Sequence, residues 1–373
     1  MTRMMLRAAG ALGAVHVLAH PRGLHSSWSL SAPSQQSPHT LIAVAGSTEH
    51  FQSLEAVVSG LPVELLLVGQ SQAEIRAQAP ALARASGLLW IPSAGGPGHQ
   101  QLNRLWPMLP GVSWVHSFSA GVDGLKPFID HSIKPLASQG KVSLSNGRGA
   151  FSSSLAEYSL TAMLYFNKMI QRCEANRRGR VWDKFIMPVM HGKTIGLVGY
   201  GSIGKATGTA AKQAFGCRIL ALRRRPGQEA DGPADECFGF DDRFEFFRQC
   251  DYVVASLPST PLTQKFIGQA ELDAMKPSAV LISIGRGATV DEDALEATLK
   301  AGKLRGAAMD VFATEPLPKD SGLWDLENVL ITAHNADFTE DYFQLGCSVW
   351  RKNLVQFLAG EPLVTPVDVN AGY

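Results

Sequence analysis

The chain has 373 residues, of which 45% are hydrophobic and 18% charged, so it is long and apolar enough to fold into about two globular domains. Its 34 Lys and Arg residues balance 33 Asp and Glu residues, which argues against a broad surface for nucleic acid or for an acidic membrane. The five cysteines are scattered without the spacing of metal ligands or of a disulfide framework, so we expect no metal site. No uncharged apolar run approaches the roughly 20 residues that cross a bilayer, so we expect no membrane span.

The N-terminal segment differs in composition from the rest of the chain. Residues 1–48 contain no Asp or Glu but carry Arg3, Arg7, Arg22 and many serines, which is the profile of an organelle transit peptide. We therefore expect residues 1–40 to be a mitochondrial leader. A plastid signal, or a plain disordered extension of a cytoplasmic protein, would have a similar composition.

Apolar runs bounded by turn residues alternate with helical patterns over the next 80 residues. Strands are predicted at 41–45, 63–68, 87–91 and 114–118, and helices at 51–58 and 72–85. This alternation is typical of a parallel sheet that is covered by helices on both faces.

A second series begins after the Gly-rich stretch 147–150, which we interpret as a hinge. Helices are predicted at 152–175, 203–215 and 342–358, and strands at 194–198, 218–222, 252–256, 280–283, 306–310 and 329–332. The fold class is therefore α/β, with parallel strands in both halves.

The strongest local motif is the glycine pattern Gly199-Tyr-Gly201-Ser202-Ile203-Gly204, which lies directly between a predicted strand and a predicted helix. In that context it is the fingerprint of a dinucleotide site: the glycines permit a tight turn and a close approach to a pyrophosphate, and the helix N-terminus supplies amide donors. A Gly-rich turn without a ligand is the alternative.

The end of the next strand decides how the adenosine ribose is bound, usually through an acidic residue. Here strand 218–222 ends in Arg223, Arg224 and Arg225, so no carboxylate is present for the 2′-hydroxyl of NAD. Guanidinium groups suit the 2′-phosphate of NADP, which makes NADP the expected cofactor and NAD the alternative. A solvent-exposed basic loop that does not contact the ribose would give the same sequence pattern.

Three consecutive strand ends carry polar residues that suit the reduction of a carbonyl. Arg286, Glu315 and His334 follow the strands at 280–283, 306–310 and 329–332. A cation can bind a carboxylate and a developing alkoxide, a histidine can supply the proton, and a carboxylate can orient the histidine. Singly, each has a simpler explanation as a helix cap, a surface carboxylate or a core histidine.

Several motifs in fixed order resemble those of the D-isomer-specific 2-hydroxyacid dehydrogenases, and within them the glyoxylate/hydroxypyruvate reductases. The resemblance runs from about Leu41 to the C-terminus. It rests, besides the fingerprint, on Ser119-Ala-Gly-Val-Asp123, Asn146-Gly-Arg-Gly-Ala150 with Leu155-Ala-Glu157, Ile284-Gly-Arg-Gly-Ala-Thr-Val-Asp-Glu-Asp-Ala-Leu295, Asp310-Val-Phe-Ala-Thr-Glu-Pro316 and Thr332-Ala-His334.

The resemblance implies a role for each matching residue. Arg286 would bind the substrate carboxylate and carbonyl oxygen, His334 would be the acid and base, and Glu315 would hold the other ring nitrogen of His334. Asp310 would contact the nicotinamide carboxamide, and Pro258 would lie along the adenosine side of the cofactor. Backbone amides at Ala120, Gly121 and Val122 would bind the substrate carboxylate. Ala333 departs from the proline that many members carry before the histidine.

The same resemblance implies two Rossmann-like, doubly wound domains with a cleft between them. Residues 41–150, completed by 338–373, would bind the substrate, and residues 151–337 would bind the dinucleotide. The expected activity is the NAD(P)H-dependent reduction of a small 2-keto acid to the D-2-hydroxy acid by a homodimer. The competing hypothesis is a protein that senses dinucleotides without catalysing a reaction.

Overall fold

The computed structural model describes residues 40–47, 51–69, 71–92, 98–224 and 232–373. The expected leader, residues 1–40, therefore lies outside the described residues except for Thr40, as does Arg225. None of the helices in the described ranges is both long and apolar enough to cross a bilayer.

The first half of the chain forms a five-stranded, wholly parallel sheet in the order β2-β1-β3-β4-β5. Its strands are β1 (Thr40–Gly46), β2 (Val63–Leu67), β3 (Gly87–Ile91), β4 (Trp114–Ser117) and β5 (Ser143–Asn146). The helices between them are α1 (Phe51–Val57), α2 (Gln72–Ala77), α3 (Ala79–Leu82), α4 (Gly98–Leu105), α5 (Lys126–Phe128) and α6 (Lys134–Ala137).

The second half forms a seven-stranded parallel sheet in the order β12-β11-β10-β9-β6-β7-β8. Its strands are β6 (Thr194–Val198), β7 (Arg218–Leu222), β8 (Glu236–Phe238), β9 (Tyr252–Ala255), β10 (Val280–Ser283), β11 (Gly306–Met309) and β12 (Val329–Ile331). The helices are α7 (Ser152–Asn167), α8 (Ile170–Gly179), α9 (Ser202–Phe215), α10 (Arg243–Gln249), α11 (Gln269–Ala274), α12 (Glu292–Lys300) and α13 (Tyr342–Ala359).

The order of strands in the second sheet reverses at β6. The chain runs from β6 to β7 and β8 on one side and then returns to β9 on the other. Ligands of open α/β sheets bind at such switch points, outside the carboxyl ends of the strands. The fold therefore places the loops after β6 and β9 where a dinucleotide is expected.

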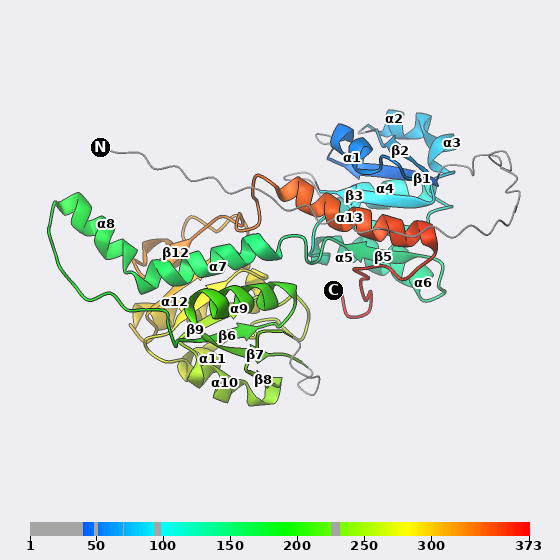
Figure 1. Cartoon of the computed structure of the whole chain (residues 1–373). Helices are drawn as coiled ribbons and strands as arrows, with labels where there is room; N and C mark the ends of the chain where they lie inside the picture. The colour runs from blue at the N-terminus through cyan, green and yellow to red at the C-terminus, as the bar shows by residue number, and fades with distance from the viewer. Residues whose placement is uncertain (1–39, 48–50, 70, 93–97, 225–231) are drawn as a thin grey trace, which may run out of the picture. The chain divides into compact units, whose positions relative to one another are not determined.

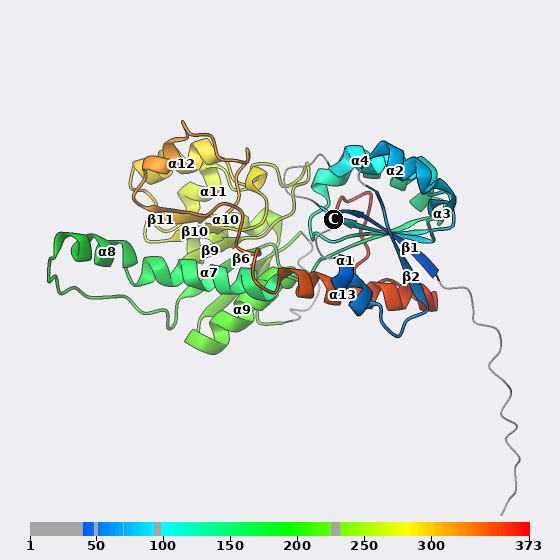
Figure 2. The same ribbon diagram turned by 90° about the horizontal axis from the view of Figure 1, so that it is seen from above.

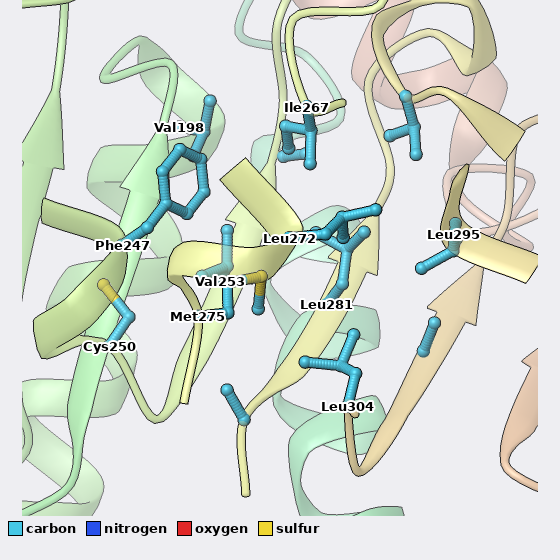
Figure 3. Packing of buried hydrophobic residues seen from close by; sticks show 14 of the residues in the cluster. Val198, Phe247, Cys250, Val253, Ile267, Leu272, Met275, Leu281, Leu295 and Leu304 are labelled. Atoms are coloured by element: carbon cyan, nitrogen blue, oxygen red, sulfur yellow. The ribbon is translucent and has the colours of Figure 1, made fainter. Parts of the chain in front are cut away.

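The two sheets have separate apolar cores. In the second sheet one core cluster gathers Val253 and Leu281 from the strands with Leu272 and Leu295 from the covering helices (Figure 3). On the other face α7 packs against α9 (Figure 1). In the first sheet, α13 contacts α1 and buries Trp350 among residues of β1 and β4, so the C-terminal helix packs on the N-terminal sheet (Figure 2).

All predicted strands are confirmed to within one residue, whereas two predicted helices are interrupted. The helix expected at 72–85 is divided at Gln78, just before Pro80. The helix expected at 152–175 ends at Asn167, because Met169 has a left-handed backbone with φ +52°, and a second helix starts at Ile170. Strands β5 and β8 were not predicted.

Candidate active site

The residues predicted to be catalytic lie together at one edge of the second sheet. β10, β11 and β12 are neighbours and run parallel, so their carboxyl ends lie side by side. Arg286 follows β10, Glu315 lies in the loop after β11, and His334 follows β12. The sheet thus brings together the three side chains that the sequence places at separate strand ends.

His334 and Glu315 form a hydrogen-bonded pair. The Nδ1 atom of His334 lies 2.7 Å from Oε2 of Glu315. Because a carboxylate can only accept, Nδ1 carries the hydrogen, which leaves Nε2 as the nitrogen that exchanges a proton with a substrate. The other carboxylate oxygen of Glu315 accepts the amide hydrogen of Phe312 at 2.9 Å, which fixes the carboxylate itself.

The loop that carries His334 is held by the buried carboxylate of Asp310, which is 1% exposed. Oδ1 of Asp310 accepts from the Thr332 hydroxyl at 2.6 Å and from the Asn335 amide at 3.1 Å, and Oδ2 accepts from the Ala336 amide at 3.3 Å. These bonds hold His334 in a left-handed conformation with φ +53°. The contact of Asp310 with a nicotinamide stays a prediction, since the carboxylate bonds its own loop.

Tyr158 extends this network from α7. Its hydroxyl lies 2.7 Å from Oγ1 of Thr332, and because Thr332 donates to Asp310, Tyr158 must be the donor. Burial raises the pKa of Tyr158 to about 12, so this donor keeps its proton at neutral pH.

Arg286 contacts the loop that follows β4 in the first sheet. Its Nε donates to Oδ1 of Asp123 at 2.9 Å, and Nη1 donates to the carbonyl oxygen of Gly285 at 2.9 Å. The guanidinium also fills the space beside Gly121, where an added Cβ would lie 1.5 Å from Nη2. The predicted carboxylate-binding residues Arg286 and Gly121 are therefore in contact, with Ala120 and Val122 on either side of Gly121.

Two acidic residues at the site were not singled out by the sequence. Asp123 pairs with Arg286, and Asp337 experiences the charges of both His334 and Arg286. Burial raises the pKa of Asp337 above its ordinary value, and Asp310 adds to the rise, while His334 and Arg286 oppose it. Asp123 ends the motif Ser119–Asp123 and Asp337 lies three residues after His334, but an acidic residue in a loop gives no sequence signal of its partner.

The glycine fingerprint adopts the geometry of a phosphate-binding turn. Gly199 has φ +94°, and its amide donates to the Leu222 carbonyl at 3.1 Å, which ties the turn to the end of β7. A Cβ on Gly204 would lie 2.6 Å from the Gly199 carbonyl oxygen, so a side chain there would separate turn and helix. A Cβ on Gly201 would meet nothing within 4 Å, which leaves open space at the N-terminus of α9, where Ser202 and Ile203 begin the helix.

The residues expected at the adenosine end lie next to this turn. Pro258 follows β9, and the Ser256 hydroxyl donates to the Gly199 carbonyl at 3.0 Å. Arg223 follows β7, and its guanidinium carbon lies 5.9 Å from the centre of the Tyr200 ring. Arg224 comes next and is exposed. These features fit a dinucleotide, whereas no cluster of metal-binding side chains occurs among the residues that the structure describes.

The chain is similar to known proteins over most of its length. Residues 160–336 match the family described as D-isomer specific 2-hydroxyacid dehydrogenase, NAD binding domain. The chain is 34% identical over 291 residues to glyoxylate/hydroxypyruvate reductase B of Pectobacterium carotovorum subsp. carotovorum, covering 76% of this chain and 85% of that protein. It is 34% identical over 231 residues to glyoxylate reductase of Thermococcus gammatolerans, covering 61% and 67%.

Solved structures resemble the whole described fold. A D-isomer specific 2-hydroxyacid dehydrogenase family protein from Aeromonas salmonicida superposes with a TM-score of 0.73 at 25% identity, covering 89% of this chain and 100% of that chain. An NADPH-dependent glyoxylate/hydroxypyruvate reductase from Sinorhizobium meliloti, in complex with NADP and malonate, superposes with a TM-score of 0.64 at 25% identity, covering 89% and 98%.

Proposed function

Because the chain belongs to the D-isomer specific 2-hydroxyacid dehydrogenases, we propose that it reduces a small 2-keto acid of the glyoxylate or hydroxypyruvate type to the D-2-hydroxy acid with NADPH. The observation that carries this proposal is the His334–Glu315 hydrogen bond of 2.7 Å on the same sheet edge as Arg286. The relatives named as glyoxylate or hydroxypyruvate reductases support the substrate class.

Each of the three side chains has a distinct task in this reaction. Arg286 binds the keto acid carboxylate and stabilises the charge that develops on the carbonyl oxygen. His334 gives a proton from Nε2 to that oxygen, while Glu315 keeps the ring in place through its bond to Nδ1. Bound NADPH would supply the hydride for the keto carbon.

The cofactor would be held by the turn Gly199–Gly204 at its pyrophosphate, by Pro258 on the adenosine side and by Arg223 and Arg224 at the 2′-phosphate. Hydrogen bonds to charged groups contribute about 1.5 to 3 kcal/mol each, so NADPH should be favoured over NADH at least tenfold in kcat/KM. The double variant Arg223→Asp, Arg224→Gln should erase or invert that ratio. Equal kcat/KM values for both cofactors in the parent would contradict the preference.

Initial rates with glyoxylate, hydroxypyruvate, pyruvate and bulkier keto acids, each with NADPH and with NADH, test the activity. We expect turnover with the small keto acids and a fall in kcat/KM as the side chain grows. A protein that only senses dinucleotides would bind NADPH but turn over none of them, and that result would replace the enzyme by the sensor.

We propose that the protein is a homodimer and that the segment after α8 forms part of its interface. Trp182 is 98% exposed, Ile186 92% and Val189 61%, which is an unusual concentration of exposed apolar side chains for a monomer. Light scattering after size-exclusion chromatography should give twice the mass of the chain. The Ile186→Asp variant should shift it toward the single mass, and a monomeric parent would overturn the proposal.

We also propose that residues before Leu41 form a mitochondrial leader that activity does not require. A chain that begins near Ser37 should fold and turn over at the parental rate. A fluorescent protein fused after residues 1–48 should be imported into mitochondria; cytosolic or plastid fluorescence would contradict this address.

A further inference from the structure

Tyr200, the second residue of the glycine fingerprint, has two cations near its ring. Its ring centre is 5.9 Å from the Arg223 guanidinium carbon at the end of β7 and 5.7 Å from Nζ of Lys205 in the first turns of α9. The ring is 7% exposed, and its hydroxyl accepts the Ala234 amide hydrogen at 2.9 Å. The tyrosine is therefore fixed at both ends beside the residue expected to bind the ribose.

A second tyrosine approaches the neighbouring arginine from a remote part of the chain. The ring centre of Tyr373 is 5.8 Å from the Arg224 guanidinium carbon. Tyr373 belongs to a segment that is anchored on the first sheet, since the Val367 amide donates to the Leu144 carbonyl in β5 at 2.9 Å. Two arginines of the second sheet thus each face a tyrosine, one local and one from residues 366–373.

The 368–373 segment is folded into a closed turn. The Asp368 carboxylate accepts the amide hydrogens of Asn370 and Ala371 at 2.9 and 3.0 Å. The Asp368 amide in turn donates to the Tyr373 carbonyl at 3.1 Å. These bonds hold the backbone from which the Tyr373 side chain reaches Arg224.

An arginine that contacts a tyrosine ring is well suited to bind a phosphate. The ring attracts the flat face of the guanidinium, whereas all five N–H donors lie in the guanidinium plane and point past the ring edge. A cation–π contact of this kind therefore reduces the freedom of a long side chain before the ligand arrives without using its donors.

We propose that Tyr200 and Tyr373 are positioning residues that hold Arg223 and Arg224 for the 2′-phosphate of NADP, so that the 366–373 segment takes part in cofactor selection. This proposal rests on the NADP preference stated above. It predicts that ligands with a 2′-phosphate lose affinity when either ring is removed, and that ligands without one do not.

Calorimetric binding of adenosine 2′,5′-bisphosphate and of 5′-ADP tests the proposal without any turnover. Tyr373→Ala should weaken the bisphosphate about two- to fivefold, which corresponds to one exposed cation–π contact, and should leave 5′-ADP unchanged. Tyr373→Phe keeps the ring and should bind both ligands as the parent does. The NADPH to NADH ratio of kcat/KM should fall by the same factor as the bisphosphate affinity.

Tyr200 is tested in the same way with Tyr200→Phe and Tyr200→Leu. The phenylalanine variant lacks the hydroxyl that accepts the Ala234 amide and is therefore the reference for the ring, and relative to it the leucine variant should lose about two- to fivefold in affinity for the bisphosphate. Melting temperatures identify any variant that is misfolded. In that event the Tyr373 pair alone decides the proposal, because its ring lies outside the fingerprint.

The outcomes separate the two claims. If the parent binds both ligands equally and Arg224→Gln changes neither affinity, the NADP preference itself is wrong. If Arg224→Gln weakens only the bisphosphate but Tyr373→Ala does not, the arginine binds without its ring and the proposal fails alone. Equal losses for both ligands in Tyr373→Ala would likewise overturn it, because that result indicates a structural role.

Discussion

The two sheets contribute to the site in different ways. The second sheet supplies polar side chains from three neighbouring strand ends, and it buries the Asp310 carboxylate that holds the loop of one of them, His334. The first sheet supplies mainly backbone, at Ala120–Val122, and it buries a titratable histidine, His116, in its own core. Substitutions at the edge of the second sheet should therefore change catalysis at constant stability, whereas titration within the first sheet should change stability at constant catalysis.

The largest effect is expected for His334→Ala. General acid catalysis contributes about 10²- to 10⁴-fold, so kcat should fall by that factor while NADPH affinity and melting temperature stay near the parental values, because the side chain is half exposed. Stopped-flow rates and NADPH titration measure the two quantities. His131→Ala, at an exposed histidine of the first sheet domain, is the control and should turn over normally. Near-normal turnover of His334→Ala would remove this residue from the mechanism.

Arg286→Ala should have the next largest effect. Loss of hydrogen bonds to a charged carboxylate costs about 1.5 to 3 kcal/mol, which lowers kcat/KM for the keto acid roughly 10- to 150-fold. Arg286→Lys should fall between parent and alanine, since lysine keeps the charge but cannot bond Asp123 and Gly285 with a planar fork. An unchanged KM and kcat in the alanine variant would mean that the substrate carboxylate is bound elsewhere.

Gly121→Ala tests where the two sheets contact each other at the site. The new Cβ would lie 1.5 Å from Nη2 of Arg286, so the guanidinium must move, and we expect about a tenfold loss of kcat/KM for the keto acid at constant NADPH affinity. Gly124→Ala is the matched control, because a Cβ there meets nothing within 4 Å. Parental kinetics in Gly121→Ala would show that Arg286 does not need its observed position.

The smallest effect on catalysis is expected from His116, which lies in the core of the first sheet. Its Nδ1 is 2.8 Å from Oγ of Ser145, which also accepts from the Trp114 indole, and burial lowers the pKa of His116 to about 3. Between about pH 3 and 6.5 the unfolded chain binds a proton that the folded chain does not. The free energy of unfolding should therefore decrease as the pH falls below 6.5, by up to about 1.4 kcal/mol per pH unit from this group.

Denaturant titrations of the parent and of His116→Gln between pH 7 and 4.5 isolate this contribution. The variant should show a shallower loss of stability toward acid, whatever its stability at pH 7. Identical pH dependence in His116→Gln and the parent would contradict the buried neutral state.

The elements that the sequence predicted are those whose pattern is local. Strand β6 and helix α9 were predicted because apolar runs and the glycines lie next to each other in the sequence, and Arg286, Glu315 and His334 were chosen as candidates because each follows a strand. The break between α7 and α8 at Met169 was not predicted, because the apolar spacing of α7 continues past that residue. Asp123 was not assigned a partner either, since its bond to Arg286 joins residues 163 positions apart. Such contacts depend on how the strands are ordered in space, and the spacing of apolar residues along the sequence does not give that order.

The contact between Gly121 and Arg286 also limits how this protein can be engineered. A library that aims at larger keto acids would ordinarily vary every residue around the substrate carboxylate. Here any side chain at position 121 displaces the guanidinium, and any change at Asp123 removes the partner of its Nε. Diversity introduced at these two positions would mostly yield impaired clones, so screening effort is better placed on exposed positions in the loop that follows His334, such as Phe338, which is 75% exposed.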